Sequence, residues 1–129
     1  MSDQPLVLLV EDNPHNLKLA RDVLEFAGFT VAIADCGEEG VALAASTLPD
    51  LILMDIQLPG IDGYAALEQI RGNRATTHIP VIALTAFAMD GDRDRVLSFG
   101  FDGYMEKPIS VRDFPTEVRR HLHEAERRP

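Results

Sequence analysis

Polar residues able to do chemistry stand directly after four short apolar runs of the sequence. A charged residue straight after a buried strand has no packing role, so Asp55, which follows Leu-Ile-Leu-Met, indicates a functional carboxylate. Carboxylates, a hydroxyl and an ammonium in one place can hold a divalent cation and a phosphoryl group. The residues concerned are Glu11, Asp12, Asp55, Thr85 and Lys107.

Alternating short strands and longer helices must position these residues. Runs rich in leucine and β-branched residues alternate with segments of helical period along the chain, which predicts a parallel α/β sheet. The continuous apolar character of the runs is typical of strands covered by helices on both faces. The predicted strands are 6–10, 30–34, 51–54, 80–84 and 103–105.

The predicted helices have recognisable end signals. Asn13 is a good N-cap for the first helix, and Gly28 is suited to end it. Pro115 fits only the first turn of a helix, which places the start of the last helix near Asp113 or Phe114. The other helices are predicted at about 38–45, 64–71 and 90–99, and the last one reaches about Glu124.

These elements predict an α/β fold, a doubly wound sheet of five parallel strands flanked by five helices. The expected architecture is flavodoxin-like, with strand order 2-1-3-4-5. A chain of 129 residues fits one hydrophobic core, so we expect one domain over residues 1–124. Residues 125–129 carry no apolar period and are expected to form a frayed C-terminal tail.

The polar residues converge on one edge of such a sheet. Ligands of open parallel sheets bind at the carboxyl ends of the strands, where the strand order reverses. If the second and third strands lie on opposite sides of the first, then Glu11, Asp12 and Asp55 share one crevice. Crowded carboxylates repel one another and need a cation, and hard oxygen ligands without His or Cys favour Mg²⁺. With Lys107 and Thr85 added, the crevice suits a small phosphoryl group.

Each of these residues also has a simpler structural explanation when it is taken alone. Glu11 and Asp12 are acids beside a helix N-terminus, where the helix dipole favours them. Thr85 alone is a strand-end hydroxyl, and Lys107 alone is a solvated charge. Their joint placement at four strand ends is what favours a functional site.

Composition excludes several classes of protein. Twelve Lys and Arg against 21 Asp and Glu give a net charge of −9, so the domain is expected to bind neither nucleic acid nor anionic membrane surfaces. The longest apolar run is far shorter than the roughly 20 residues of a membrane-spanning helix, which predicts no membrane insertion. A single cysteine, Cys36, forms no internal disulfide, and no basic-then-apolar leader opens the chain. We therefore expect a cytoplasmic protein.

Five motifs in order resemble the receiver domain of bacterial response regulators. They are Glu11-Asp12-Asn13, Leu53-Met54-Asp55, the run Pro59-Gly60 with Gly63, Leu84-Thr85-Ala86, and Lys107-Pro108. Within that family, residues 54–59, 85–89 and 107–110 look most like the DivK-type single-domain cell-cycle regulators. Similar runs occur in receivers of hybrid histidine kinases, so a module derived from such a kinase is the alternative.

The resemblance implies a role for each residue of the site. Asp55 is expected to be the phosphoacceptor, which takes a phosphoryl group from a histidine of a partner protein. Asp12, Asp55 and the backbone carbonyl of Gln57 would ligate Mg²⁺, with Glu11 acting through a water. Thr85 and Lys107 would bind the phosphoryl oxygens, and the Lys107–Pro108 peptide bond is expected to be cis.

The family's switch couples the threonine to an aromatic residue on the last strand. Here Thr85 would move toward the phosphate and Tyr104 would turn inward, although Tyr104 also suits a half-buried core position. The surface of the fourth helix, fifth strand and fifth helix would report the change, with Val96 and Phe101 as candidates. Gln57 and Phe87 occupy the positions that tune phosphoryl lifetime, and apolar Phe87 predicts slow self-dephosphorylation rather than a turnover enzyme.

Two kinds of partner protein are expected, one that donates the phosphoryl group and one that responds to it. A histidine kinase or histidine phosphotransfer protein would contact the first helix and the loop after the last strand, and a downstream effector protein would bind the signalling state. The candidate contacts with the phosphodonor are His15, Asn16, Leu17, Pro108 and Ile109.

Two functions from other classes compete with phosphorelay signalling. A Mg-dependent aspartyl phosphohydrolase commonly has a second acid two residues after its nucleophile, where this chain has Gln57. A flavodoxin-like electron carrier needs a phosphate-binding loop after the first strand, where this chain has the anion-repelling run Glu-Asp-Asn-Pro. The sequence therefore favours a signalling module over both.

Overall fold

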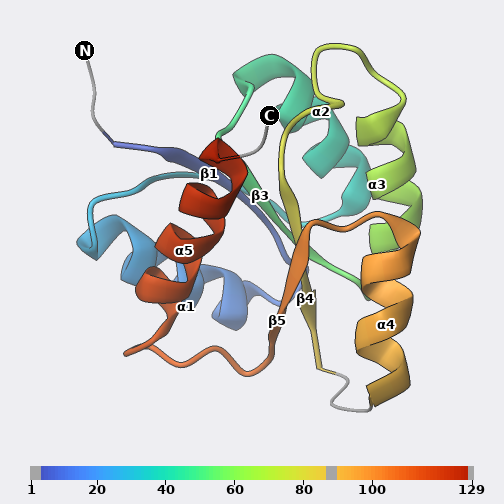
Figure 1. Ribbon diagram of the computed structural model, residues 1–129. Coiled ribbons are helices and arrows are strands. Elements are labelled where there is room, and N and C mark those ends of the chain that lie inside the picture. Colours follow the sequence, from blue (N-terminus) through green and yellow to red (C-terminus); the bar gives the residue numbers. More distant parts are fainter. Residues whose placement is uncertain (1–3, 87–89, 128–129) are drawn as a thin grey trace.

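The computed structural model describes residues 4–86 and 90–127 and has a central sheet of five parallel strands (Figure 1). The strand order is β2-β1-β3-β4-β5, which confirms the predicted α/β fold and its topology. Strands β1 and β3 are parallel neighbours in this order, so their carboxyl ends meet at one edge of the sheet. The strands are β1 Leu6–Val10, β2 Thr30–Ala34, β3 Leu51–Asp55, β4 Val81–Thr85 and β5 Gly103–Glu106.

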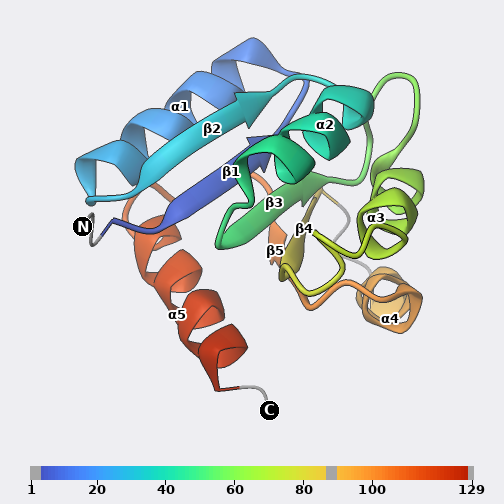
Figure 2. The same ribbon diagram turned by 90° about the horizontal axis from the view of Figure 1, so that it is seen from above.

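Helices cover both faces of the sheet. Helices α1 and α5 lie against one face, and α2, α3 and α4 lie against the other (Figure 2). No helix within residues 4–86 and 90–127 is both long enough and apolar enough to cross a membrane. The helices are α1 Pro14–Phe26, α2 Gly37–Thr47, α3 Gly63–Arg71, α4 Asp90–Phe99 and α5 Phe114–Glu126.

The strands contribute side chains to two separate hydrophobic cores, because successive side chains of a strand point to opposite faces of the sheet. Val7 and Leu9 of β1 pack with α1 and α5, whereas Leu8 and Val10 pack with the helices of the other face. All four side chains are fully buried. This two-sided burial explains why the strands read as unbroken apolar runs in the sequence.

The predicted helix ends are confirmed where the sequence carries capping signals. The Asn13 side chain accepts hydrogen bonds from the backbone amides of His15 and Asn16, as an N-cap does. Gly28, one residue beyond the C-cap of α1, has a φ of +101°, a conformation that favours glycine. Pro115 lies in the first turn of α5, where its missing amide removes no helical hydrogen bond.

Three strands and two helices end later than the sequence predicts, and one of these helices is α2, which runs to Thr47 rather than to residue 45. The strands predicted at 51–54, 80–84 and 103–105 each run on to the polar residue that follows, because the ladder pairs Asp55 with Leu84 and Thr85 with Glu106. Backbone pairing does not require apolar side chains. For the same reason α5 continues to Glu126 rather than ending at Glu124. The domain boundary at residue 124 stays a prediction.

Candidate functional site

Three carboxylates gather at the carboxyl edge of the sheet. Asp55 ends β3, and Glu11 and Asp12 follow β1, which lies beside β3 with Val10 opposite Met54. One oxygen from each carboxylate lies within 4.8 Å of the others. Glu11 and Asp55 are buried, with 2% and 4% of their surface exposed, whereas Asp12 is exposed. The crevice predicted from the strand order is therefore present.

Lys107 reaches into this cluster from the end of β5. Its Nζ lies 2.7 Å from Glu11 Oε1 and 2.9 Å from Asp55 Oδ2, so one ammonium bridges two buried carboxylates. Its backbone amide donates to the carbonyl of Thr85, and the Lys107–Pro108 peptide bond is cis, as expected. Burial by itself lowers the pKa of Lys107, but hydrogen bonding and charge attraction to Glu11 and Asp55 raise the pKa above its ordinary value. The ammonium is therefore charged at neutral pH.

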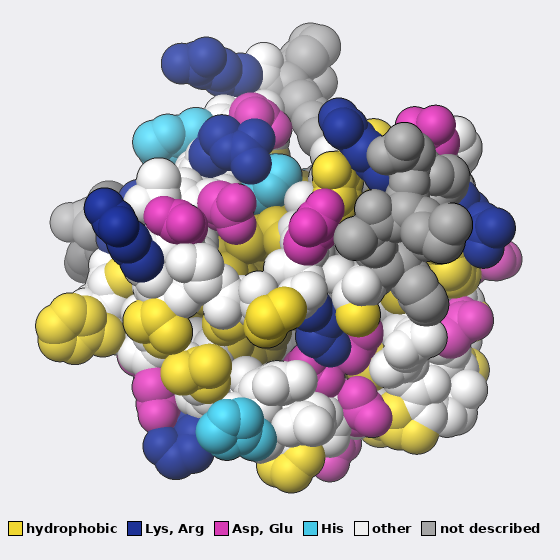
Figure 3. Space-filling model, turned by 90° about the horizontal axis from the view of Figure 1, so that it is seen from below, with side chains coloured by type: hydrophobic (Ala, Val, Ile, Leu, Met, Phe, Trp, Pro, Cys, Tyr) yellow, Lys and Arg dark blue, Asp and Glu magenta, His cyan; other side chains and the backbone are white. Residues whose placement is uncertain are grey.

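The donor set fits a hard divalent cation. Three carboxylates and one ammonium leave two negative charges when all are ionised, which is the charge a divalent cation neutralises. Oxygen ligands without histidine or cysteine in the group are those that magnesium prefers. Figure 3 looks onto this edge of the molecule and shows acidic and basic side chains gathered near its centre.

The loop after β3 is folded tightly against the backbone of Asp55. The Gln57 amide donates to Asp55 Oδ1 over 3.0 Å, and the Gly63 amide donates to the Ile56 carbonyl over 2.9 Å. A Cβ added at Gly63 would lie only 2.6 Å from the Asp55 carbonyl oxygen. In the sequence, Gly63 stands out only as part of a family motif. Its packing against Asp55 depends on a long-range fold of the loop that no local pattern reveals.

Thr85 and Tyr104 share one face of the sheet on adjacent strands. Tyr104 pairs with Ala83, and Thr85 pairs with Glu106, so the two side chains are diagonal neighbours. Thr85 is buried at the end of β4, and Tyr104 is half-buried. Ala83, which lies opposite Tyr104 and two residues before Thr85 on the same face, has a small side chain.

Two candidates for the signalling surface, whose orientation the sequence leaves open, are part of the core. Val96 and Phe101 are only 2% and 4% exposed and pack in the cluster under α3 and α4. Helix α4 has few apolar residues, so its buried face cannot be assigned from its sequence. The lifetime position Phe87 lies outside the described residues.

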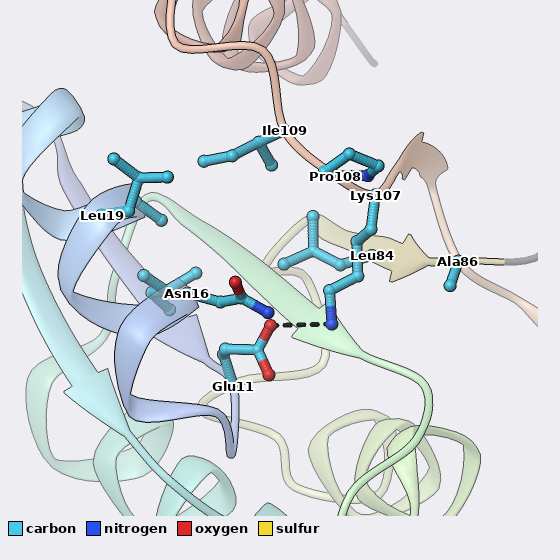
Figure 4. A pocket seen from close by; sticks show the side chains of 10 residues that line it. Glu11, Asn16, Leu19, Leu84, Ala86, Lys107, Pro108 and Ile109 are labelled. Atoms are coloured by element: carbon cyan, nitrogen blue, oxygen red, sulfur yellow. Dashed lines mark ion pairs between the residues drawn. The ribbon is translucent and has the colours of Figure 1, made fainter.

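A cavity of about 280 Å³ opens beside the carboxylate cluster, between α1 and the loop after β5 (Figure 4). Glu11, Asn16 and Lys107 form its polar side, with the Glu11–Lys107 ion pair at that boundary. The rest of its wall is largely apolar, formed by Leu9, Leu19, Ala20, Leu84, Pro108 and Ile109.

Three of the five residues predicted to contact the phosphodonor line this cavity, and two do not. Asn16, Pro108 and Ile109 line it, whereas His15 is exposed outside it and Leu17 packs against the core between α1 and α5. Leu19, which was not among the predicted contacts, also lines the cavity. Positions three apart share a helix face, so the spacing from Asn16 to Leu19 was the available signal.

Comparison with known proteins agrees with this geometry. The family model described as the response regulator receiver domain matches residues 7–119. The chain belongs to the response regulator receiver domain family. Receiver domains act in two-component signalling, which the match supports over the phosphohydrolase and electron-carrier alternatives.

Individual relatives place this receiver domain near the DivK proteins. The polar-differentiation response regulator DivK of Brucella ovis is 44% identical over 119 residues, which cover 92% of this chain and 97% of DivK. The DivK of Brucella anthropi is also 44% identical over the same share of each chain. The predicted resemblance to DivK-type regulators is therefore confirmed.

Solved structures of receiver domains match closely as well. A CheY-like receiver domain protein from Methanospirillum hungatei has a TM-score of 0.85 at 31% identity, covering 96% of this chain and 98% of its own. The receiver domain of a sensor histidine kinase from Pseudomonas aeruginosa, solved with magnesium coordinated in its active-site cleft, has a TM-score of 0.84 at 36% identity. That match covers 93% of this chain and 98% of the other.

Proposed function

We propose that this chain is a single-domain response regulator that accepts a phosphoryl group on Asp55 from a phosphohistidine of a partner protein. A carboxylate oxygen of Asp55 forms a bond to phosphorus, the phosphorus–nitrogen bond breaks, and the histidine leaves with the electron pair. The observation that carries the proposal is the Lys107 ammonium bridging Glu11 and Asp55 beside Asp12. Such a site supplies positioning and charge stabilisation, which are most of what phosphoryl transfer requires.

The residues present fit a magnesium ion. Asp12, Asp55 and the backbone carbonyl of Gln57 would hold it, with Glu11 acting through a water. When bound, magnesium neutralises charge on the transferring phosphoryl oxygens. Lys107 would pair with one phosphoryl oxygen and the Thr85 hydroxyl would donate to another, and the Gln57 amide holds Asp55 Oδ1 in place.

The same residues couple phosphorylation to conformation in this proposal. Thr85 moves toward the phosphoryl group, and Tyr104 turns inward along the diagonal between β4 and β5. The face formed by α4, β5 and α5 then differs between the two states and signals to an effector protein. Gln57 and Phe87 set the lifetime of the acyl phosphate, with Phe87 making self-dephosphorylation slow. An unchanged decay rate in Phe87→Glu would count against that part.

The phosphodonor is a histidine kinase or a histidine phosphotransfer protein that docks on the cavity between α1 and the loop after β5. An apolar wall beside the phosphoacceptor gives a partner helix a surface to bury while its histidine faces Asp55. The similarity to DivK supports a role for this chain in polar differentiation and the cell cycle. A cytoplasmic location agrees with a cysteine content that allows no internal disulfide.

Intact-mass measurement tests the proposal. The protein is incubated with acetyl phosphate with and without magnesium, alongside Asp55→Asn. We expect one magnesium-dependent phosphoryl addition to the parent and none to the variant. A folded parent that gains no phosphoryl group would contradict the proposal.

A further inference from the structure

One charged contact on the α4–β5 side has no role in the chemistry described so far. The Arg93 guanidinium carbon lies 5.4 Å from the centroid of the Tyr104 ring, which is the distance of a cation–π interaction. Arg93 is exposed and Tyr104 is half-buried, and both line a groove of about 550 Å³ between α4, β5 and α5. The contact joins a helix to the strand that carries the proposed switch residue.

Helix α4 brings Arg93 to Tyr104 from the solvent side. Val96, three residues further on, is buried in the core cluster against which Tyr104 packs. Residues three apart share a helix face, so one face of α4 contacts Tyr104 with Val96 on the core side and Arg93 on the solvent side. Arg95, only two residues from Arg93, points elsewhere and does not line the groove.

Acidic groups favour a cation at this place. The groove is also lined by five acidic residues, Asp102, Glu106, Asp113, Glu117 and Glu124. Besides Arg93, the arginine that lines it is Arg120. Asp102 is already paired with Arg71 and Glu124 with Arg120, so the remaining carboxylates of the groove supply the negative field that favours the guanidinium over the ring.

We propose that Arg93 is a positioning residue that holds Tyr104 in its present half-buried position along the groove and so opposes phosphorylation of Asp55. This inference rests on the proposed function, because it takes the inward turn of Tyr104 as the phosphorylated arrangement. Turning inward toward Thr85 withdraws the ring from the guanidinium, and the cation–π contact is lost. A contact present in only one of two states shifts the equilibrium between them by its full free energy.

The test measures binding of a phosphoryl mimic, beryllofluoride, in the presence of magnesium. The chain contains no tryptophan and two tyrosines, so Tyr64→Phe leaves Tyr104 as the fluorescent reporter. In this background we expect Arg93→Gln to tighten beryllofluoride binding by about two- to fivefold, the size expected of an exposed cation–π contact. Arg95→Gln removes the same charge from the same helix and is expected to leave the affinity unchanged.

A double-mutant cycle separates the ring contact from a general charge effect. If Arg93 acts through the ring, Arg93→Gln has no effect on beryllofluoride affinity once Tyr104 is replaced by Leu, with intrinsic binding followed by calorimetry. Arg93→Lys, which keeps a cation over the ring, is expected to lie between the parent and Arg93→Gln. An affinity in Arg93→Gln that is unchanged or weaker than in the parent would overturn the inference. Failure of the parent itself to bind beryllofluoride would instead overturn the proposed function.

Discussion

Lys107 Nζ lies 2.9 Å from Asp55 Oδ2 although one complete strand, β4, separates the strands that carry the two residues. The lysine spans this strand because its backbone amide is hydrogen-bonded to the last carbonyl of β4, that of Thr85. The long side chain then passes over the end of the sheet. Asp55 is thus held from two sides, by the ammonium at Oδ2 and by the Gln57 amide at Oδ1.

Magnesium is expected to stabilise the folded protein through Asp12. A ligand that binds only the folded state at 100 times its dissociation constant adds about 2.7 kcal/mol to the free energy of unfolding. Urea titrations with and without magnesium should show this gain in the parent and lose most of it in Asp12→Asn. Glu25→Gln, which removes an exposed carboxylate from the last turn of α1, should keep the full gain.

Gly63→Ala is expected to impair phosphorylation without touching any charged group. The added Cβ would meet the Asp55 carbonyl oxygen at 2.6 Å and the Ile56 Cα at 2.9 Å, so the backbone beside the phosphoacceptor must shift. Overpacking of this kind costs about 1–3 kcal/mol of stability. We expect a slower reaction with acetyl phosphate together with weaker magnesium binding.

Gly72→Ala is the matched control for Gly63→Ala. Gly72 stands at the other end of α3, and its added Cβ would come no nearer than 3.3 Å, to the Glu68 carbonyl oxygen, outside its two chain neighbours. Its acetyl phosphate rate should match the parent's. Equal rates in Gly63→Ala and the parent would show that the packing against Asp55 does not position it.

Ile109→Asp is expected to slow phosphorylation by a phosphohistidine protein but not phosphorylation by acetyl phosphate. Ile109 lines the apolar cavity, so a carboxylate there should slow transfer from a phosphohistidine protein by about tenfold or more, the effect of losing one well-placed interface residue. Acetyl phosphate needs no docking surface and should react at nearly the parent rate. Val111→Asp places the same charge on an exposed residue of the same loop and should affect neither rate. Equal slowing with both donors would point to damage at Asp55 instead.

The pH dependence of stability should report the buried His121. Burial lowers its pKa below the ordinary value of 6.5, helped by Arg120 and opposed by Glu124. Between the two pKa values His121 is protonated in the unfolded chain but not in the folded protein. The free energy of unfolding therefore falls as pH drops below 6.5 toward the pKa of the folded state. One such group changes stability by at most about 1.4 kcal/mol per pH unit.

Comparing two histidine variants isolates this contribution. His121→Leu should flatten the stability profile between neutral and mildly acid pH, as followed by urea unfolding. His123→Leu, on the exposed side of the same helix, should leave the slope as it is in the parent. A parent slope that persists in His121→Leu would assign the effect to other groups.

Much of the fold follows from local signals in the sequence. The unbroken apolar run before Asp55 predicts a strand buried on both faces, and Asn13 predicts the start of α1, because burial and capping act on neighbouring residues. The clustering of Glu11, Asp12 and Asp55 also follows, since the strand order alone brings their backbone positions to one edge.

Features that depend on the direction of a side chain do not follow from the sequence. Val96 is buried, an orientation that the sequence leaves open because α4 has too weak an apolar pattern to define its inward face. Leu19 lines the cavity while Leu17 enters the core, a difference set by how α1 rotates against the sheet. The contact between Arg93 and Tyr104 joins two elements whose packing only the assembled fold defines.

Mapping the phosphorylated residue decides whether Asp55 is the phosphoacceptor. After reaction with acetyl phosphate and magnesium, borohydride reduction converts an aspartyl phosphate to homoserine, and peptide mass analysis shows which residue has changed. We expect homoserine at position 55 alone, and only when magnesium is present. Reduction at Asp12, or at no aspartate in a protein that has gained a phosphoryl group, would contradict the assignment of Asp55 as the phosphoacceptor.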